Sequence, residues 1–318
     1  MNNQPYIKAC IYSWRHFIRV FYNQHVQGKK YSSNITTYLE EYAEITNVIL
    51  RLMIDYNSIF NKAELTLKQH SWFTEKEFQD VYGRFKIFET KIRSDDEYFE
   101  MLTMIVFYSG FKAATVESKE KIILSHFPEY SLVAEYTEAD IQRIMSDPKM
   151  IKNERKIKAC ISNAWAFRRI IQHYGSFLEY LNVYNAKDSF ENLIELKNEL
   201  EYRFDYLGGT TVFHFLTDLG YNVLKPDRVI SRIFKRLGLI DDERKLLQTV
   251  EQGREFAKHT GYPIRYIDII FVKLGQMGKS EMFGLEEGIC LEKSPKCMVC
   301  LLKEYCNYYK QNPTINWR

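Results

Sequence analysis

The chain has 318 residues and a formal net charge of +3; 46% of its residues are hydrophobic and 27% are charged. This composition is typical of a soluble globular protein and excludes a disordered chain, a collagen-like chain and a disulfide-bonded peptide. The 14 Gly and 7 Pro are too few for the many turns of a β-sandwich or β-barrel. The sequence has no apolar run of about 18 residues, so we expect no transmembrane helix and a cytoplasmic protein with reduced thiols.

Hydrophobic residues recur at three- and four-residue spacing along most of the chain, which predicts an all-α protein. The first such segment, residues 35–60, follows the polar residues Ser32, Ser33 and Asn34. Its spacing is compatible with a coiled-coil seam, but further apolar residues broaden the face and favour a helix buried in a helical lobe. The other segments expected to be helical are residues 96–108, 118–127, 137–145, 153–173, 189–204, 212–219, a helix starting at Pro226-Asp227, 242–259 and 264–278.

Four of the six cysteines lie close together near the C-terminus, with the spacing C-x6-C-x2-C-x5-C. They are Cys290, Cys297, Cys300 and Cys306. In a cytoplasmic chain such a group is expected to bind a metal centre rather than to form disulfides. Zinc and a [4Fe–4S] cluster both accept four thiolates. A single loop with only one close C-x2-C pair favours the [4Fe–4S] cluster, and zinc is the alternative.

The cysteine segment 290–306, CLEKSPKCMVCLLKEYC, resembles the iron–sulfur loop of helix-hairpin-helix DNA glycosylases such as endonuclease III and MutY. This resemblance implies a two-lobed, all-α fold with a structural [4Fe–4S] cluster. Residues 1–90 would form an N-terminal helical extension, residues 91–216 a helical barrel domain with the hairpin, and residues 217–318 the lobe of the catalytic aspartate and the cluster. It also implies that Lys293 and Lys296 of the loop lie near DNA phosphates.

A glycine- and threonine-rich step between two predicted helices is the candidate hairpin. It consists of Gly208, Gly209, Thr210 and Thr211. Backbone N–H groups at a helix N-terminus bind phosphate, and glycines allow the phosphate to approach closely. The alternative is a glycine C-cap followed by a threonine N-cap. The resemblance favours the hairpin, and we expect these four residues to contact DNA.

Asp227 lies in the segment KPDRVISR, which resembles the segment that carries the catalytic aspartate of these glycosylases. Cleavage of an N-glycosidic bond builds positive charge on the sugar, which a carboxylate stabilises while it orients a water molecule. The alternative is an ordinary acidic residue in the first turn of a helix. Bifunctional members of the family use a hairpin lysine as an amine nucleophile. Here Thr210 or Thr211 occupies that position, so we expect a monofunctional enzyme that leaves an abasic site, unless Lys225 acts as a lyase nucleophile.

A second resemblance covers the middle of the chain. Residues 99–116, 156–164 and 204–211 resemble 3-methyladenine DNA glycosylase I, which implies an alkylated purine such as 3-methyladenine as the first candidate substrate. The base-recognising glutamate of that family falls at Ile105, and a tryptophan of its base pocket falls at Ala113. A modified or hypermodified pyrimidine, for example in phage DNA, is therefore an alternative substrate. A non-catalytic DNA-binding iron–sulfur protein is a further alternative.

Aromatic side chains and local charge complete the predicted site. Tyr108 and Phe111 are the candidate base-pocket residues, because aromatic faces hold an extruded base. Lys and Arg concentrate in residues 149–169, 225–236 and 290–318, near the motifs described above. We expect these segments to form a phosphate-binding stripe. The expected partner is double-stranded DNA, with no membrane association, and the expected protein is a nucleoid-associated monomer.

Overall fold

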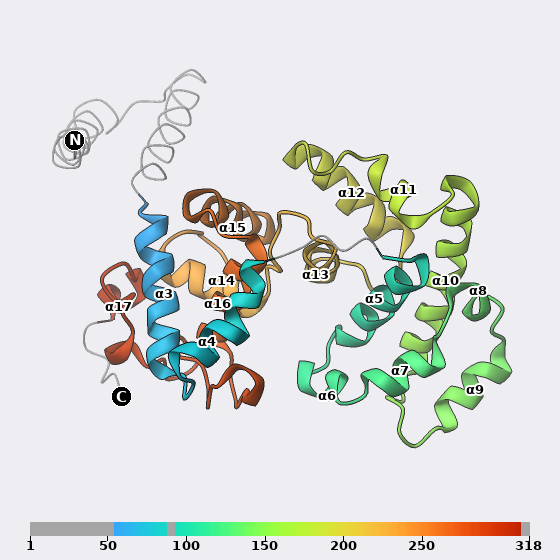
Figure 1. Cartoon of the computed structure of the whole chain (residues 1–318), viewed down its shortest axis with the longest axis horizontal. Coiled ribbons are helices and arrows are strands. Elements are labelled where there is room, and N and C mark those ends of the chain that lie inside the picture. The colour runs from blue at the N-terminus through green and yellow to red at the C-terminus, as the bar shows by residue number, and fades with distance from the viewer. Residues whose placement is uncertain (1–53, 88–92, 313–318) are drawn as a thin grey trace, which may run out of the picture. The chain divides into compact units, whose positions relative to one another are not determined.

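The computed structural model describes residues 54–87 and 93–312, and the regular elements in these residues are helices (Figure 1). This observation confirms the all-α prediction. No helix in the described ranges is long and apolar enough to cross a membrane. In chain order, the helices are α3 (Tyr56–His70), α4 (Glu75–Tyr82), η1 (Gly83–Lys86), α5 (Asp95–Tyr108), α6 (Ala113–Glu117), α7 (Glu120–His126), α8 (Tyr130–Val133), α9 (Glu138–Ser146), α10 (Glu154–Tyr174), α11 (Phe177–Asn182), α12 (Phe190–Arg203), α13 (Thr210–Asp218), α14 (Arg228–Leu237), α15 (Leu246–Thr260), α16 (Ile264–Gly275), η2 (Glu281–Phe283), η3 (Cys297–Val299) and α17 (Asn307–Gln311).

Local sequence signals set many of the helix ends. Capping boxes start α4 at Thr74 and α5 at Ser94. In each, the hydroxyl accepts a hydrogen bond from the backbone N–H of the glutamate three residues later, and the carboxylate of that glutamate accepts one from the backbone N–H of the cap residue. Gly238 and Gly261 end α14 and α15 in the left-handed region, with φ of 77° and 70°. Glycine adopts this conformation without steric strain.

Helices α5 to α13 share one hydrophobic core. The long helix α10 packs against α5, α8, α9 and α11, and α13 packs against α5 and α12. The core includes stacked and tilted aromatic rings; the centroids of Phe167 and Phe177 are 4.4 Å apart, and those of Phe99 and Phe167 are 5.9 Å apart. Aromatic side chains thus make up a large part of this core.

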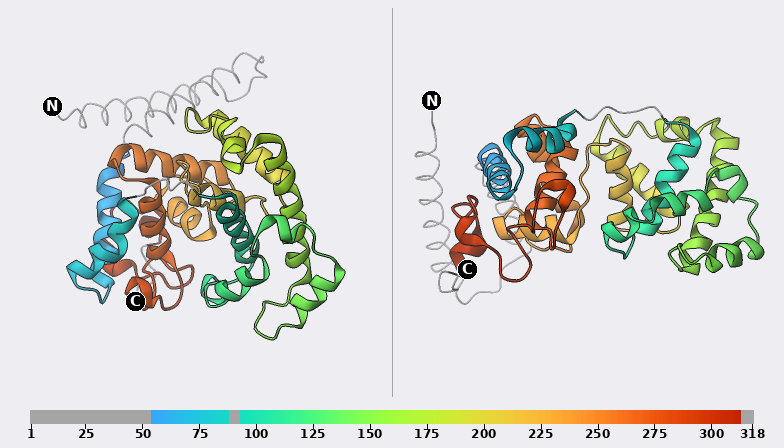
Figure 2. Two further views of the ribbon diagram at one scale, coloured as in Figure 1. Left: turned by 45° about the vertical axis from the view of Figure 1, so that its right-hand side comes forward. Right: turned by 60° about the horizontal axis from the view of Figure 1, so that its bottom comes forward.

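Helices α3, α14, α15 and α16 pack against one another around a second aromatic cluster. Phe234, Phe256 and Phe271 lie with their ring centroids 4.9 to 5.4 Å apart, and Phe60 of α3 packs on this group. Figure 2 shows α3, in blue, beside the orange helices α15 and α16. Residues 56–86, which fall inside the predicted N-terminal extension, thus pack with the helices that follow Asp227, while the boundaries at residues 90 and 216 stay predictions.

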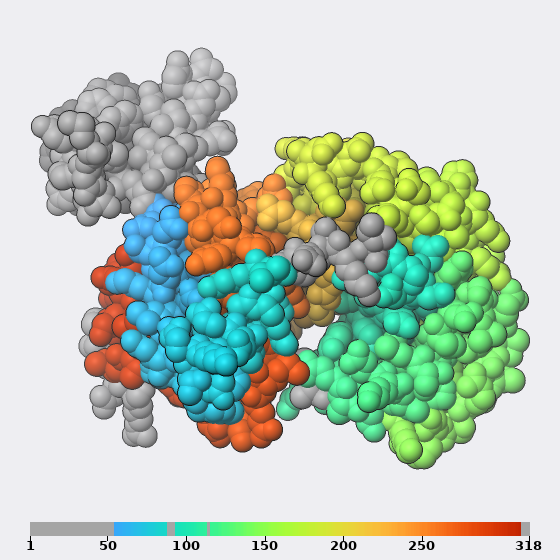
Figure 3. Space-filling model, in the orientation of Figure 1, coloured from blue at the N-terminus to red at the C-terminus, as the bar shows by residue number. Residues whose placement is uncertain are grey.

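Helix α4 also packs into this second group of helices. The hydroxyl of Tyr82 donates to the carbonyl of Phe283 in η2 at 3.0 Å, and the two rings lie 5.4 Å apart. Figure 3 shows α3 and α4, in blue and cyan, against the orange and red segments of the later sequence. Residues separated by about two hundred positions in sequence are therefore joined here.

The predicted helices agree with the structure to within a few residues, with one exception. The helix expected over residues 35–60 is wrong at its C-terminal end, because residues 54 and 55 are not helical and α3 runs from Tyr56 to His70. Buried Ala63, Thr66 and Leu67 extend the inward-facing surface beyond the predicted end. Residues 1–53, with most of that helix and most of the predicted extension, lie outside the described residues. The helices missed by the sequence reasoning are the short α4, α6, α8, α11 and α17.

Candidate functional site

Asp227 is the N-cap residue of α14. Its Oδ1 accepts hydrogen bonds from the backbone N–H groups of Val229 at 2.9 Å and Ile230 at 3.0 Å. The side chain therefore stabilises the start of the helix, as the alternative interpretation of the sequence predicts. Both bonds go to one carboxylate oxygen and the residue is only partly buried, so Oδ2 lies outside the cap. The catalytic role of Asp227 stays a prediction.

A second carboxylate, Asp268 of α16, lies behind the Asp227 segment and was not found by the sequence reasoning. It is buried; its Oδ1 accepts from the backbone N–H of Lys225 at 3.1 Å, and its Oδ2 accepts from Nη1 of Arg265 at 2.8 Å. Burial raises the pKa of Asp268 to about 6, the Asp227 charge contributes to the increase, and Arg265 opposes it. A lone acidic residue within the apolar sequence IRYIDIIFVKLG is the signal that could have identified it.

Arg265 joins Asp268 to α13. Its Nη2 lies 3.5 Å from Oδ1 of Asp218, and Oδ2 of Asp218 lies 3.4 Å from Nε2 of His214. The His214 ring is 5.7 Å from the ring of Tyr108, at the end of α5. Burial lowers the pKa of His214 well below its usual value, so the imidazole is neutral at physiological pH. A series of polar contacts thus runs from His214, whose ring lies beside that of the predicted base-pocket residue Tyr108, to the segment before Asp227.

The predicted hairpin has a different local geometry from the cap alternative. Helix α12 ends at Arg203 with Phe204 as its C-cap, and the N-cap of α13 is Gly209 with a φ of 57°. Neither glycine is therefore a C-cap, and neither threonine is the N-cap. The N–H of Gly209 donates to Oε1 of Glu201 at 2.8 Å, and Glu201 is also paired with Lys197. The N–H of Gly209 is therefore already hydrogen-bonded to the Glu201 carboxylate and is not free to bind phosphate.

A groove with a volume of about 920 Å³ is lined mainly by α14, by the segment 238–246 that follows it and by α17. Thr210 of the hairpin lines it together with Pro226 and Arg228, which flank Asp227 in sequence. Acidic residues also reach the groove, and Lys235 lies 3.9 Å from Glu243. The basic side chains that line it are Arg228, Arg232, Lys235, Arg236 and Arg244.

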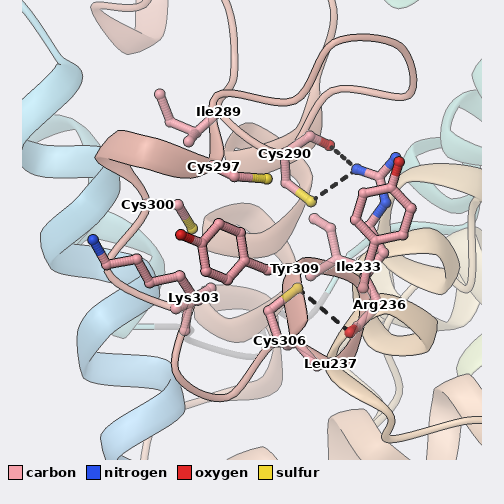
Figure 4. A pocket seen from close by; sticks show the side chains of 12 residues that line it. Ile233, Arg236, Leu237, Ile289, Cys290, Cys297, Cys300, Lys303, Cys306 and Tyr309 are labelled. Atoms are coloured by element: carbon pink, nitrogen blue, oxygen red, sulfur yellow. Dashed lines mark hydrogen bonds between the residues drawn. The ribbon is translucent and has the colours of Figure 1, made fainter. Parts of the chain in front are cut away.

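The four clustered cysteines line one small pocket (Figure 4). Figure 4 shows their side chains arranged around the pocket, with Arg236 on one side. Nη1 of Arg236 donates to Sγ of Cys290 at 3.2 Å and to the carbonyl of Leu291 at 2.7 Å, and Nη2 donates to the carbonyl of Glu292 at 3.0 Å. Helix α3 contacts the cysteine loop on the other side of the pocket, where Oγ1 of Thr66 accepts a hydrogen bond from the backbone N–H of Leu301 at 3.1 Å.

The donor atoms that this pocket offers are four cysteine thiols. Four thiols face one space, and Arg236 supplies a cation and a hydrogen-bond donor beside Cys290, as a negatively charged thiolate site requires. Burial raises the pKa of Cys297 to about 11 and that of Cys300 to about 12. Within residues 54–87 and 93–312, no group of three or more His, Cys, Asp or Glu side chains is arranged to hold a metal ion.

Glycine allows close packing beside the cysteine pocket. A Cβ on Gly238, at the end of α14, would overlap the side chain of Asn307, which directly follows Cys306. The position also has positive φ. Gly238 therefore lets α14 and the last cysteine approach each other.

The remaining predicted site residues differ in their exposure and in their partners. Lys293 is exposed, and Nζ of Lys296 lies 2.8 Å from Oε1 of Glu287, so Lys296 is paired within the chain. Phe111 is 38% exposed, and its ring lies 5.4 Å from Nζ of Lys156. Ile105 is 2% exposed and belongs to the core.

Lys156 corrects part of the predicted phosphate-binding stripe. It lies in the basic segment 149–169 but is buried, because its ammonium group donates to the carbonyls of Val106 and Ser109. These carbonyls lie at the end of α5, where a cation is electrostatically favourable. Lys156 thus holds the predicted base-pocket turn from within and is not on the surface.

Residues 87–244 match the sequence profile of the methyladenine glycosylase family. This match supports the DNA glycosylase superfamily for that part of the chain. Among solved structures, 3-methyladenine DNA glycosylase I from Staphylococcus aureus is similar, with 22% identity, 48% of this chain and 89% of that chain covered, and a TM-score of 0.37. The 8-oxoguanine DNA glycosylase of Thermotoga maritima has 16% identity, 69% and 96% coverage, and a TM-score of 0.46.

Proposed function

We propose that this protein is a DNA glycosylase that extrudes a damaged or modified base and hydrolyses its N-glycosidic bond. The observation that carries the proposal is that hairpin residue Thr210 and the two residues flanking Asp227 line one groove rich in Arg and Lys. The match of residues 87–244 to the methyladenine glycosylase family supports the same activity. Double-stranded DNA is the partner in this proposal.

The groove supplies the phosphate contacts. Arg228 is exposed at the first position of α14 and Lys235 is exposed further along it, whereas Arg232 between them is buried and donates to the carbonyls of Gly275 and Cys290. Arginine and lysine bind the DNA backbone without reading its sequence, and they fix the duplex in register. The hairpin N–H of Gly209 lies in an adjoining pocket that shares Arg244 and Leu246 with the groove, and it becomes a further contact when phosphate displaces Glu201. The groove therefore holds the duplex while the target nucleotide turns out of the stack.

Asp227 supports loss of the base. Its Oδ2 lies outside the helix cap, so its negative charge is available to stabilise the cationic sugar and to orient water. The hairpin positions Thr210 and Thr211 carry no amine, so the reaction ends with hydrolysis and an abasic site. Lys225 is the residue through which a lyase step would proceed, and trapping of a covalent DNA adduct with borohydride tests for it.

The cysteine pocket binds a [4Fe–4S] cluster in this proposal. Cys290, Cys297, Cys300 and Cys306 are the ligands, and the cluster fixes the loop that packs on α3 and α14. Iron and acid-labile sulfide in about equal amounts, with a brown colour, are expected in anaerobically purified protein. If the purified protein contained zinc and no iron, zinc would be the metal of this site in place of the cluster.

An alkylated purine such as 3-methyladenine is the first candidate substrate, because the matching family is named for methyladenine. A modified or hypermodified pyrimidine is the second. The observation that favours testing it is that Ile105 is buried and apolar, so it offers no hydrogen bond to an alkylated purine at that position.

A base-release screen tests the proposal. Duplexes that carry 3-methyladenine, another alkylated purine, or a hydroxymethylated or glucosylated cytosine are incubated with the protein, and the released base and alkali-labile sites are measured. Release of one base class, with an intact abasic strand before alkali treatment, is expected. Tight DNA binding without release of any base would favour a non-catalytic DNA-binding protein.

A further inference from the structure

We infer that Arg265 and Asp268 are positioning residues that hold the Lys225–Asp227 segment, and through it the Asp227 carboxylate, in place. This inference deepens the proposed function, because it rests on Asp227 as the catalytic residue. Neither residue has an exposed position in the basic groove, and both lie on α16, on the inner side of the segment. They act on Asp227 through the backbone.

First, Asp268 contacts the segment directly, because its Oδ1 accepts a hydrogen bond from the backbone N–H of Lys225 at 3.1 Å. Lys225 is two residues before Asp227, and the residue between them is Pro226, whose ring fixes its φ. The N–H of Asp227 also donates to the carbonyl of Lys225 at 2.8 Å, which closes a tight turn. With these constraints, a displacement of the Lys225 amide is passed on to Asp227.

The second step is the pairing of Arg265 with Asp268 at 2.8 Å. A buried carboxylate without a counter-charge is costly and tends to become protonated. Arg265 opposes the rise in the pKa of Asp268 and so keeps its carboxylate ionised and able to accept from Lys225. A charged acceptor makes a stronger hydrogen bond to an amide than a neutral one.

The third step is the second carboxylate on Arg265. Nη2 of Arg265 lies 3.5 Å from Oδ1 of Asp218, at the end of α13, and Asp218 contacts His214. One guanidinium thus connects the helix that follows the hairpin with the segment that carries Asp227. The placement of Asp227 is thereby tied to the element that begins with the hairpin glycine.

A buried ion pair that only stabilises the fold is the competing explanation. Buried pairs contribute little net stability, since desolvation offsets their attraction. A purely structural pair would lower stability when removed, but it would not loosen the cap at the start of α14 in the folded protein. The local protection of the Val229 and Ile230 N–H groups, which Asp227 caps, therefore separates the two explanations.

The test compares Asp268→Asn, Arg265→Gln and Arg265→Lys with wild type in the full chain. Asp140→Asn is the matched control, because Asp140 also pairs with an arginine, Arg143, at 3.2 Å on the surface of α9. Amide hydrogen exchange is measured at 10 °C below the lowest unfolding temperature of the set. Single-turnover base release and DNA affinity are measured at the same temperature.

Asp268→Asn and Arg265→Gln are expected to speed exchange at Lys225, Val229 and Ile230 by roughly tenfold or more and to slow base release by roughly 10- to 100-fold. DNA affinity should change by less than about threefold, and Arg265→Lys should recover part of the rate. Asp140→Asn should behave as wild type in every assay.

Two results would overturn the inference. One is unchanged exchange at the three amides in Asp268→Asn, and the other is faster exchange with an unchanged rate of base release. If wild type releases no base, the proposed function fails, while the exchange data still decide whether Arg265 and Asp268 hold the segment.

Discussion

Asp227 has two roles that a pair of substitutions separates. As the N-cap of α14 it accepts two backbone hydrogen bonds through Oδ1, and as the proposed catalytic residue it contributes a negative charge. Asparagine keeps the oxygen that caps the helix but removes the charge, because Asn and Asp are nearly equivalent N-caps. Alanine removes both.

The two effects have different magnitudes. Loss of the cap in Asp227→Ala should lower the free energy of unfolding by about 1 kcal/mol, which corresponds to a decrease in Tm of about 2 °C for a folded unit of this size. Asp227→Asn loses only the favourable interaction of its charge with the helix dipole, about 0.5 kcal/mol. Both variants should lose base release by roughly 100- to 1,000-fold, as for other groups that stabilise transition-state charge.

The assay is single-turnover base release from the best substrate of the screen, together with thermal unfolding and DNA affinity. Cap and charge are separated if Asp227→Asn unfolds near the wild-type temperature yet is as inactive as Asp227→Ala. The reasoning is refuted if Asp227→Asn keeps full activity. It is also refuted if the activity of the two variants follows their stability.

Further predictions concern the hairpin, the buried carboxylate and the end of α14. Glu201→Gln should bind DNA roughly fivefold more tightly, because a charge-assisted bond no longer competes with phosphate; Glu199→Gln, which removes the same charge from α12, should have a smaller effect in the same fluorescence-anisotropy titration. The pKa of Asp268 is raised to about 6 in the folded state, so the native state binds this proton more tightly than the unfolded state does. As the pH falls from 7 to 4.5, the free energy of unfolding of wild type should therefore increase by about 2 kcal/mol relative to that of Asp268→Asn, measured by chemical denaturation. An equal pH dependence in both proteins would contradict that shift. Gly238→Ala should lose about 1–2 kcal/mol from positive φ alone and lower Tm more than Gly261→Ala, where φ is also positive but no atom lies near the new Cβ; equal decreases would show that the neighbouring side chain simply moves aside.

The helices were largely predictable because helical spacing of apolar residues is a local property of the sequence. Ser94 and Asp227 also mark helix starts through capping, which depends on a few neighbouring residues. The end of α3 was not predictable in the same way. Its last ten residues, from Asn61 to His70, include many polar side chains, and only packing against α15 and α16 shows which of them face inward.

The site was predictable where chemistry is concentrated in short motifs and unpredictable where it arises from contacts between distant residues. The spacing of the four cysteines indicates a shared pocket, and they do line one. The contact between Asp268 and Lys225 joins residues 43 positions apart, and no local pattern indicates it. Likewise, the sequence around Lys156 indicates a surface cation, but its ammonium group is buried because it donates to backbone carbonyls at the end of α5.

Helix α14 has a mechanical consequence for this molecule. It begins directly after Asp227, and its second-last residue, Arg236, binds the loop that carries Cys290. Ten helical residues span about 15 Å and bend little. The helix is thus a rigid connection between the cysteine loop and Asp227. The cysteine loop and the Asp227 carboxylate are therefore attached to opposite ends of one helix.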